Sequence, residues 1–354
     1  MAIFLHIGFP KTATTSLQLA FREHVADLKA ADVCYPLIDD DFKQRYLRLY
    51  DQKRQNLTEA STGDLKKSMQ LMMELIQEAN CSDVVLSCEE LTNFMMMQYN
   101  QKNLEVMRDA LRKIDDDVRI VAYVRNPSDF YLSILQEKIK RYAGVLEPET
   151  FHTNFAKTIR LYETVFETKA IVREFHPSKL IKRDIVADFL SATGLTRVDI
   201  SKWEPIVSNE SISPEVLCAL DLARREMGGS KTSELSFAFQ ESEMFWRKMG
   251  RISREVGTPS KPVLFRHVHD TIMALNADDI KLLKERYGIS FAEGKCVEGQ
   301  SAVPKKHQIS AIENLMKVDK QLAIYIWSVF SVRAIREIFT LRKKVRRLRA
   351  SEEK

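Results

Sequence analysis

The sequence predicts an α/β fold in which a central parallel sheet is flanked by helices, followed by a helical C-terminal part. Two observations predict it. Short, continuous apolar runs alternate with stretches of helical periodicity over the first 175 residues, and this alternation is typical of βαβ units. From about residue 210 to 287 the pattern becomes mostly helical. With 354 residues, 45% of them apolar, the chain is long enough to bury a large core.

Four apolar runs predict the buried strands, and each is short enough to be a strand rather than a helix. These runs span 2–8, 84–88, 118–124 and 169–175, with helices expected around 64–79, 102–114, 128–141 and 154–167. The first run ends at a Gly-x-Pro break, so a helix is expected to follow it directly, with Thr14 or Thr15 as its N-cap.

Composition suggests one α/β domain over 1–295, whose helical portion covers about 205–295, and a C-terminal extension over 296–354. The five Cys residues are an odd number and include no C-x-x-C pair, which favours a reducing compartment over a disulfide framework. We find no basic, apolar leader at the N-terminus and no run of the roughly 18–20 apolar residues that a membrane span needs. These features favour a cytoplasmic protein.

The first segment with chemical potential lies between the first strand and the helix that follows it, and it reads His6-Ile-Gly-Phe-Pro-Lys11-Thr-Ala-Thr-Thr-Ser16. Backbone N–H groups at a helix N-terminus favour an anion, and Lys11 and the small hydroxyl residues add charge and donors. The segment is not a Walker A motif, because Lys11 follows Gly8 by only three residues. We therefore expect a phosphate-binding loop here; the alternative is that Thr14 to Ser16 only cap the helix.

The second segment leaves the strand at 118–124 and begins the next helix, and it reads Arg125-Asn-Pro-Ser-Asp-Phe-Tyr-Leu-Ser133. Arg125 is at the carboxyl end of the strand, where ligands bind in open α/β sheets. Its guanidinium can grip a phosphate in a bidentate manner, and the Ser133 hydroxyl can add a donor. The alternative is a surface ion pair between Arg125 and Asp129.

Taken in order, the two segments resemble the sulfotransferase family, whose members use 3′-phosphoadenosine 5′-phosphosulfate (PAPS) as sulfuryl donor. The resemblance implies a P-loop-like three-layer fold, no metal, and a 5′-phosphosulfate loop lined by Lys11, Thr12, Ala13, Thr14, Thr15 and Ser16. It also implies that Arg125 and Ser133 hold the 3′-phosphate. Weaker similarity to bacterial glycan sulfotransferases reaches Gly194 and extends toward Tyr287, and the chain beyond about 296 has no such resemblance.

One residue departs from the family pattern, because the family has Gly where this chain has Ala13. If the backbone there needs a positive φ, Ala costs on the order of 1 kcal/mol. If the Gly serves close approach to the donor, the methyl group weakens donor binding instead.

A third segment, Ser87-Cys88-Glu89-Glu90, ends the strand at 84–88. Sulfuryl transfer to a hydroxyl needs a base near the acceptor oxygen, and a carboxylate in a partly dry cleft can serve. A Ser-x-Glu-like turn in the family points to Glu89 as this catalytic base, beside Lys11 as the catalytic cation. Glu90 or a His remains an alternative, and so does a purely structural capping role.

The C-terminal residues 331–354 hold nine basic and three acidic side chains, so this tail carries more than the whole net charge of +5. Apolar and basic residues alternate there at helical spacing, which fits an anionic membrane surface contacted through 331–349 and hence a peripheral location on the inner face of the membrane. A partner helix, an oligomerisation tail or nonspecific nucleic-acid contact are the alternatives; no specific nucleic-acid site is expected.

The sequence thus favours a PAPS-dependent sulfotransferase that transfers a sulfuryl group in line to a hydroxyl. The expected acceptor is a sugar of a glycan or glycolipid. An ATP-dependent, kinase-like enzyme is an alternative, and so is a catalytically silent protein that keeps the nucleotide fold and acts as a membrane or scaffold protein.

Overall fold

The computed structural model describes residues 1–38, 59–92, 101–142, 144–204, 211–226, 238–257, 260–299 and 310–352, together with residues 41, 43, 44, 47 and 206. The chain forms two compact units built from alternating segments. The first unit comprises 1–127, 152–209 and 276–293, and the second comprises 128–151, 210–275 and 294–354. The division at residue 295 that the composition suggested stays a prediction.

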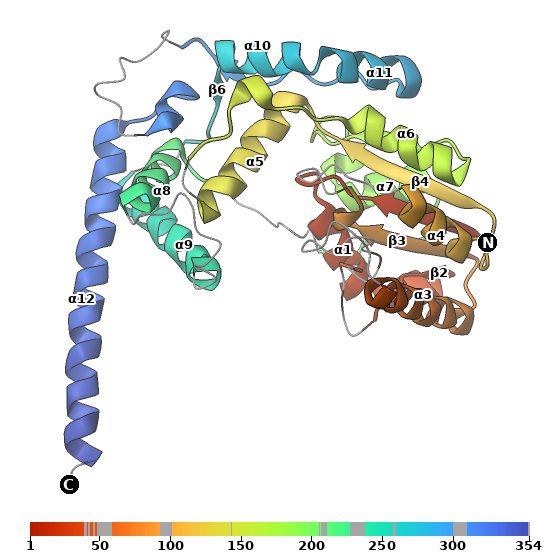
Figure 1. The fold of residues 1–354 in the computed structure, drawn as a ribbon, viewed down its shortest axis with the longest axis horizontal. Coiled ribbons are helices and arrows are strands. Elements are labelled where there is room, and N and C mark those ends of the chain that lie inside the picture. Colours follow the sequence, from red (N-terminus) through yellow and green to blue (C-terminus); the bar gives the residue numbers. More distant parts are fainter. Residues whose placement is uncertain are drawn as a thin grey trace. The chain divides into compact units, whose positions relative to one another are not determined.

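The first unit is built on a five-stranded sheet with the order β2-β3-β1-β4-β5, in which every pair is parallel (Figure 1). Its strands are β1 (Ala2–Ile7), β2 (Val33–Cys34), β3 (Asp83–Cys88), β4 (Val118–Val124) and β5 (Ile171–Glu174). The predicted central parallel sheet is therefore confirmed. The short strand β2 was not predicted, because two residues are too few to show a period.

The pairing of the middle strands decides which loops become neighbours. β1 is the central strand and pairs with β3 on one side, where Ile7 is opposite Cys88, and with β4 on the other, where His6 is opposite Val121. Because all three strands run in the same direction, their carboxyl ends meet at one edge of the sheet.

Helices cover both faces of this sheet. The helices of the first unit are α1 (Thr14–Glu23), α2 (Val25–Ala30), α3 (Glu59–Ala79), α4 (Gln101–Leu111), α6 (Phe155–Phe166), α7 (Ile185–Thr193) and α11 (Ala277–Tyr287), of which α11 packs on α6. Alternate residues of β1 and β4, such as Phe4 and Tyr123, pack with α1 and α7 in one apolar cluster. On the other face, α6 packs on β4 and against α4. The two-residue alternation arises because successive strand side chains point to opposite faces.

A buried charge network lies within the α7 side of this core. The Asp188 carboxylate is fully buried and accepts hydrogen bonds from the Tyr123 hydroxyl at 2.8 Å and from Arg173 Nη2 at 2.6 Å. Burial raises the pKa of Asp188, but these hydrogen bonds and one from the Ile181 backbone outweigh it and hold the pKa below its ordinary value. Asp188 thus ties β4, β5 and α7 together as a paired, charged group.

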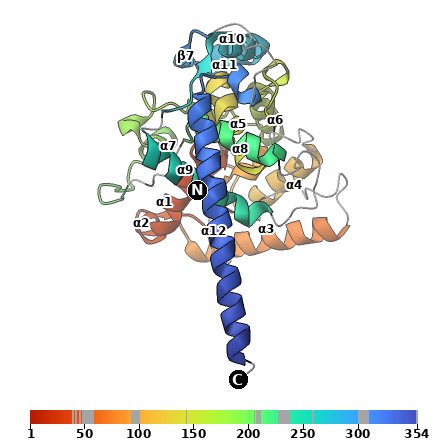
Figure 2. The same cartoon turned by 90° about the vertical axis from the view of Figure 1, so that its left-hand side faces the viewer.

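The second unit is helical, as the sequence predicted for this part of the chain. Its helices are α5 (Pro127–Arg141, whose first residue belongs to the first unit), α8 (Pro214–Glu226), α9 (Ala238–Val256), α10 (Arg266–Leu275) and α12 (Lys320–Glu352). A two-stranded parallel sheet of β6 (Leu264–Phe265) and β7 (Cys296–Val297) accompanies them. Figure 2 shows α12 as one continuous helix. In the described part of the chain, no helix combines the length and apolar content needed to cross a bilayer.

Candidate functional site

The loop between β1 and α1 holds two non-glycine residues in the left-handed region. Lys11 and Ala13 both have φ of 61°. Ala13 is the N-cap of α1, with no side-chain capping bond, and its carbonyl accepts the first helical hydrogen bond from the Leu17 N–H. The prediction that Thr14 or Thr15 caps the helix is therefore wrong: Thr14 is its first residue. A left-handed conformation costs an L-residue about 1–2 kcal/mol, so this loop stores strain of the kind found at functional sites.

The hydroxyls of Thr12 and Thr14 are turned into the protein. Both side chains are buried, and Thr12 Oγ1 donates to the Phe9 carbonyl at 2.7 Å. A Cβ at Gly8 would lie only 2.6 Å from Thr14 Cγ2, so any residue with a side chain at position 8 would clash with Thr14. The Thr12 and Thr14 side chains therefore stabilise the shape of the loop. The groups available to an anion are the backbone N–H groups of Thr14, Thr15 and Ser16, in the first turn of α1.

Arg125 directly contacts this loop. Its Nη1 donates to the Lys11 carbonyl at 3.1 Å, and its guanidinium lies 5.8 Å from the centre of the Phe175 ring. Both Lys11 and Arg125 are half-buried. The structure thus brings together the two cationic residues that the sequence singled out, although 114 positions separate them.

Glu89 lies on the turn beside the same loop. It begins the short 3₁₀ helix η2 (Glu89–Thr92), directly after β3, and is half-buried. Thr92 Oγ1 donates to the Gly8 carbonyl at 2.8 Å, which fixes this turn to the end of β1. The side chain of Glu90, the alternative base, lies outside the described part of the structure.

Among the residues predicted for the donor site, Ser133 is the one that belongs to the second unit. It lies on α5, eight positions after Arg125, and is half-buried. Its proposed role on the same phosphate as Arg125 stays a prediction.

A buried network of hydrogen bonds connects the carboxyl ends of β1 and β3. His6 Nδ1 and Ser87 Oγ are joined at 2.8 Å, and Gln18 Nε2 on α1 donates to the Ser87 carbonyl at 2.8 Å. The Gln44 side chain accepts a bond from the Ser87 N–H at 2.7 Å. Burial lowers the pKa of His6 to about 3, so its ring is neutral at physiological pH. His6 is therefore a positioning residue inside the sheet rather than a base exposed to substrate.

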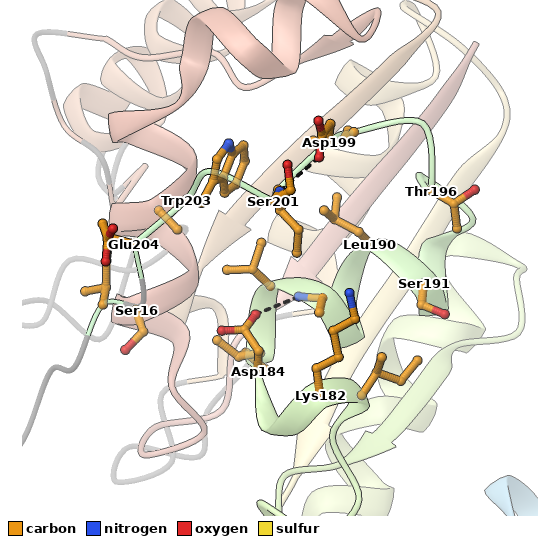
Figure 3. Close-up of a pocket in the computed structure, with 18 of the residues that line it drawn as sticks. Ser16, Lys182, Asp184, Leu190, Ser191, Thr196, Asp199, Ser201, Trp203 and Glu204 are labelled. Atoms are coloured by element: carbon orange, nitrogen blue, oxygen red, sulfur yellow. Dashed lines mark hydrogen bonds between the residues drawn. The ribbon is translucent and has the colours of Figure 1, made fainter.

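A cavity of about 640 Å³ opens beside the third residue of α1. Ser16 and Ala20 line it from α1, and residues of α7 and of the segments 181–184 and 196–206 line the rest (Figure 3). The Trp203 ring, which stacks on His24 with centroids 4.2 Å apart, forms part of the wall. The volume lies within the range of about 300–1,000 Å³ that small-molecule sites occupy.

Sequence reasoning missed this cavity and the network around Ser87. Gln18 and Ser87 look like ordinary polar residues in the sequence, since nothing local marks them as buried. The 196–206 segment shows no period that would place it over α7. The one signal in the sequence is the position of Gln18, which lies among the apolar residues Leu17, Ala20 and Phe21 of a predicted helix, just after a candidate anion-binding loop.

Comparisons of the chain with protein-family models, curated proteins and solved structures found no match. Function is therefore inferred from the residues and geometry of the site. Across the described residues, no three His, Cys, Asp or Glu side chains are grouped so that they could hold a metal ion.

The left-handed N-cap generates a first prediction. Ala13→Gly is expected to raise the free energy of unfolding by about 0.5–1 kcal/mol, because relief of about 1–2 kcal/mol of strain exceeds the added entropy of the unfolded chain, about 0.4–1 kcal/mol. Ala20→Gly in the interior of the same helix is the control and should lower stability by about 1 kcal/mol. Urea unfolding measures both. Equal destabilisation by the two variants would contradict a strained Ala13.

The buried, neutral His6 generates a second prediction, on pH. Between pH of about 6.5 and about 3 the unfolded chain binds a proton at His6 that the folded protein does not. The His6 contribution therefore makes the free energy of unfolding decrease as the pH is lowered through this window, by about 1.4 kcal/mol per pH unit. His6→Gln should remove that contribution, whereas His152→Gln, at an exposed position, should keep the wild-type slope. The test is to measure the unfolding midpoints of the wild type and of both variants between about pH 6.5 and about pH 3. Identical pH dependence of the midpoint in all three proteins would refute the prediction.

Proposed function

We propose that this chain is a PAPS-dependent sulfotransferase. The observation that carries the proposal is the hydrogen bond from Arg125 to the Lys11 carbonyl, because it joins the two loops that resemble the donor-binding motifs of that family. Two cationic residues and a helix N-terminus at one sheet edge form a favourable site for a doubly phosphorylated nucleotide.

The β1–α1 loop would act as a P-loop-like cradle for the 5′-phosphosulfate. In this proposal the N–H groups of Thr14, Thr15 and Ser16 and the Lys11 ammonium bind the 5′ end, while Arg125 binds the 3′-phosphate. The cavity beside Ser16 would take the adenosine, since it begins one turn into the same helix and has room for a nucleoside.

The transfer itself would be a single in-line displacement. The acceptor hydroxyl oxygen attacks sulfur, Glu89 takes the hydroxyl proton, and the bond between sulfur and the bridging oxygen of the 5′-phosphate breaks. The electron pair of that bond leaves with 3′,5′-ADP, where Lys11 and the loop N–H groups stabilise the developing negative charge. Most of the rate would come from positioning and charge stabilisation, as in phosphoryl transfer.

The proposed acceptor is a hydroxyl of a glycan or glycolipid. Sulfuryl transfer needs an alcohol, and the basic amphipathic C-terminal helix favours an acceptor that is carried on a membrane.

A third prediction tests the donor site. Saturating 3′,5′-ADP, at about 100 times its dissociation constant, should stabilise the protein by about 2.7 kcal/mol, seen as a rise in thermal midpoint. Lys11→Ala and Arg125→Ala should abolish the rise. Lys113→Ala and Arg119→Ala are matched controls at exposed positions and should retain it.

The outcomes of that experiment separate the alternatives. A rise with ATP but none with 3′,5′-ADP would favour the kinase-like enzyme. The absence of a rise with either nucleotide would contradict the proposed donor site.

A fourth prediction tests the base. Glu89→Gln should lower sulfuryl transfer from PAPS to an acceptor glycan by about 10²–10⁴-fold while 3′,5′-ADP binding is unchanged. Glu90→Gln is the matched variant, and a loss confined to it would move the role to that residue. Wild-type protein that binds 3′,5′-ADP but sulfates no member of a glycan panel would favour the catalytically silent protein.

A further inference from the structure

The first half of α12 is packed within the second unit. Ala323 and Ile326 are fully buried, and the Phe330 ring meets Phe245 of α9 edge-on at 4.6 Å. Arg333 of α12 pairs with Glu255 at 2.7 Å, and Glu337 pairs with Lys248 at 2.8 Å. One face of α12 is thereby fixed against α9 up to about residue 337.

A different face of the same helix is apolar and exposed. Val332, Ile335 and Phe339 are separated by three and four positions, so they lie on one side of the helix. Their exposed fractions are 49%, 52% and 59%. Six of the fifteen large apolar side chains that are exposed among the described residues belong to α12, which makes this helix the main concentration of exposed apolar surface in that part of the chain.

Basic side chains border this apolar face. Arg336 is four positions after Val332, and Arg342 and Lys343 are three and four positions after Phe339, so helical geometry places all three next to the apolar stripe. All three are exposed. The sequence adds four more basic residues by 349 and no acidic residue between Glu337 and Glu352.

The C-terminal half of α12 also lies clear of its neighbours in the second unit. Figure 1 shows it continuing beyond the ends of α8 and α9, and Leu341, at the helical position of the packed face, is 61% exposed. A long helix that leaves its packing partners with apolar and basic surface uncovered needs another surface to cover it.

Charge and apolarity together select the partner. A nucleic acid would use the cations but leave Val332, Ile335 and Phe339 in water. A second copy of α12 would cover the apolar stripe but bring two basic clusters together. Of these three surfaces, an anionic lipid surface is the one that satisfies both, with apolar side chains among the acyl chains and Arg and Lys at the headgroups.

We propose that the segment 332–349 of α12 binds in the plane of an anionic phospholipid surface, with Val332, Ile335 and Phe339 inserted and Arg336, Arg342 and Lys343 contacting the headgroups. This surface does not depend on the proposed sulfotransferase activity, because none of its residues belongs to the donor site.

The test is co-sedimentation of the full chain with vesicles of phosphatidylcholine and phosphatidylserine, and with vesicles of phosphatidylcholine alone. We expect binding to the anionic vesicles only. The double variant Arg342→Gln/Lys343→Gln should lower the partition coefficient by about 30-fold, since each cation near the surface contributes about fivefold. Ile335→Ser/Phe339→Ser should lower it by about tenfold or more.

Controls come from an exposed helix elsewhere in the chain. Lys281→Gln/Lys284→Gln and Leu282→Ser on α11 remove similar side chains and should leave vesicle binding unchanged. Circular dichroism checks that every variant is folded. The thermal shift with 3′,5′-ADP, measured on the same proteins, reports on the donor site independently of vesicle binding, so the two proposals can fail separately.

Several outcomes would overturn the proposal. These are equal binding to both kinds of vesicle, undiminished binding by either double variant, and absence of vesicle binding. In the last case, RNA binding that is lost with Arg342 and Lys343 would assign the helix to nucleic acid. A dimer in sedimentation velocity that is lost with Ile335 and Phe339 would assign it to self-association.

Discussion

The candidate site depends on the central position of β1 in the sheet. Because β1 pairs in parallel with both β3 and β4, the loop that follows Ile7 lies between the exits of two other strands. Those exits supply a carboxylate, Glu89, and a guanidinium, Arg125. A parallel sheet buried on both faces fixes the strand ends rigidly, so short loops there can hold chemical groups at defined positions. Moving β1 to an edge of the sheet would leave the loop with one neighbour.

The conformation of the β1–α1 loop lowers the stability of the folded protein. Lys11 and Ala13 adopt a conformation that L-residues avoid, and the hydroxyls of Thr12 and Thr14 are directed to the interior instead of to solvent. The hydrogen bonds among His6, Ser87 and Gln18 connect the carboxyl ends of β1 and β3, and they add no charge there because the His6 ring is neutral. The Thr12 and Thr14 side chains thus act as internal supports, and the N–H groups in the first turn of α1, which have no partner within the helix, are the groups that such a loop would offer an anion.

The two units carry different kinds of surface. The first unit contains the sheet, the strained loop and the cavity lined by α1 and α7. The second contains α12, whose net positive charge exceeds that of the whole chain and which carries six of the fifteen exposed large apolar side chains among the described residues. Outside 331–354 the positive and negative charges nearly balance, so electrostatic attraction to an anionic surface would act through one helix. This division would permit the proposed nucleotide chemistry and the proposed membrane contact to be altered separately.

By itself the sequence determined the types of element and the chemistry available to them. Continuous apolar runs predicted β1, β3, β4 and β5. The motif around Lys11 and the motif that begins at Arg125 could both be placed at strand ends. Both inferences need only local periodicity and local residue type, which do not depend on distant neighbours. The tertiary structure decided the rest. Strand order, the hydrogen bond across 114 positions from Arg125 to Lys11 and the burial that keeps His6 neutral arise from packing between segments far apart in the chain. The resemblance left open whether the position of Ala13 needs a positive φ or close approach to a donor, and only the structure shows the positive φ, because an alanine carries no sequence signal for a conformation that the surrounding loop imposes on it.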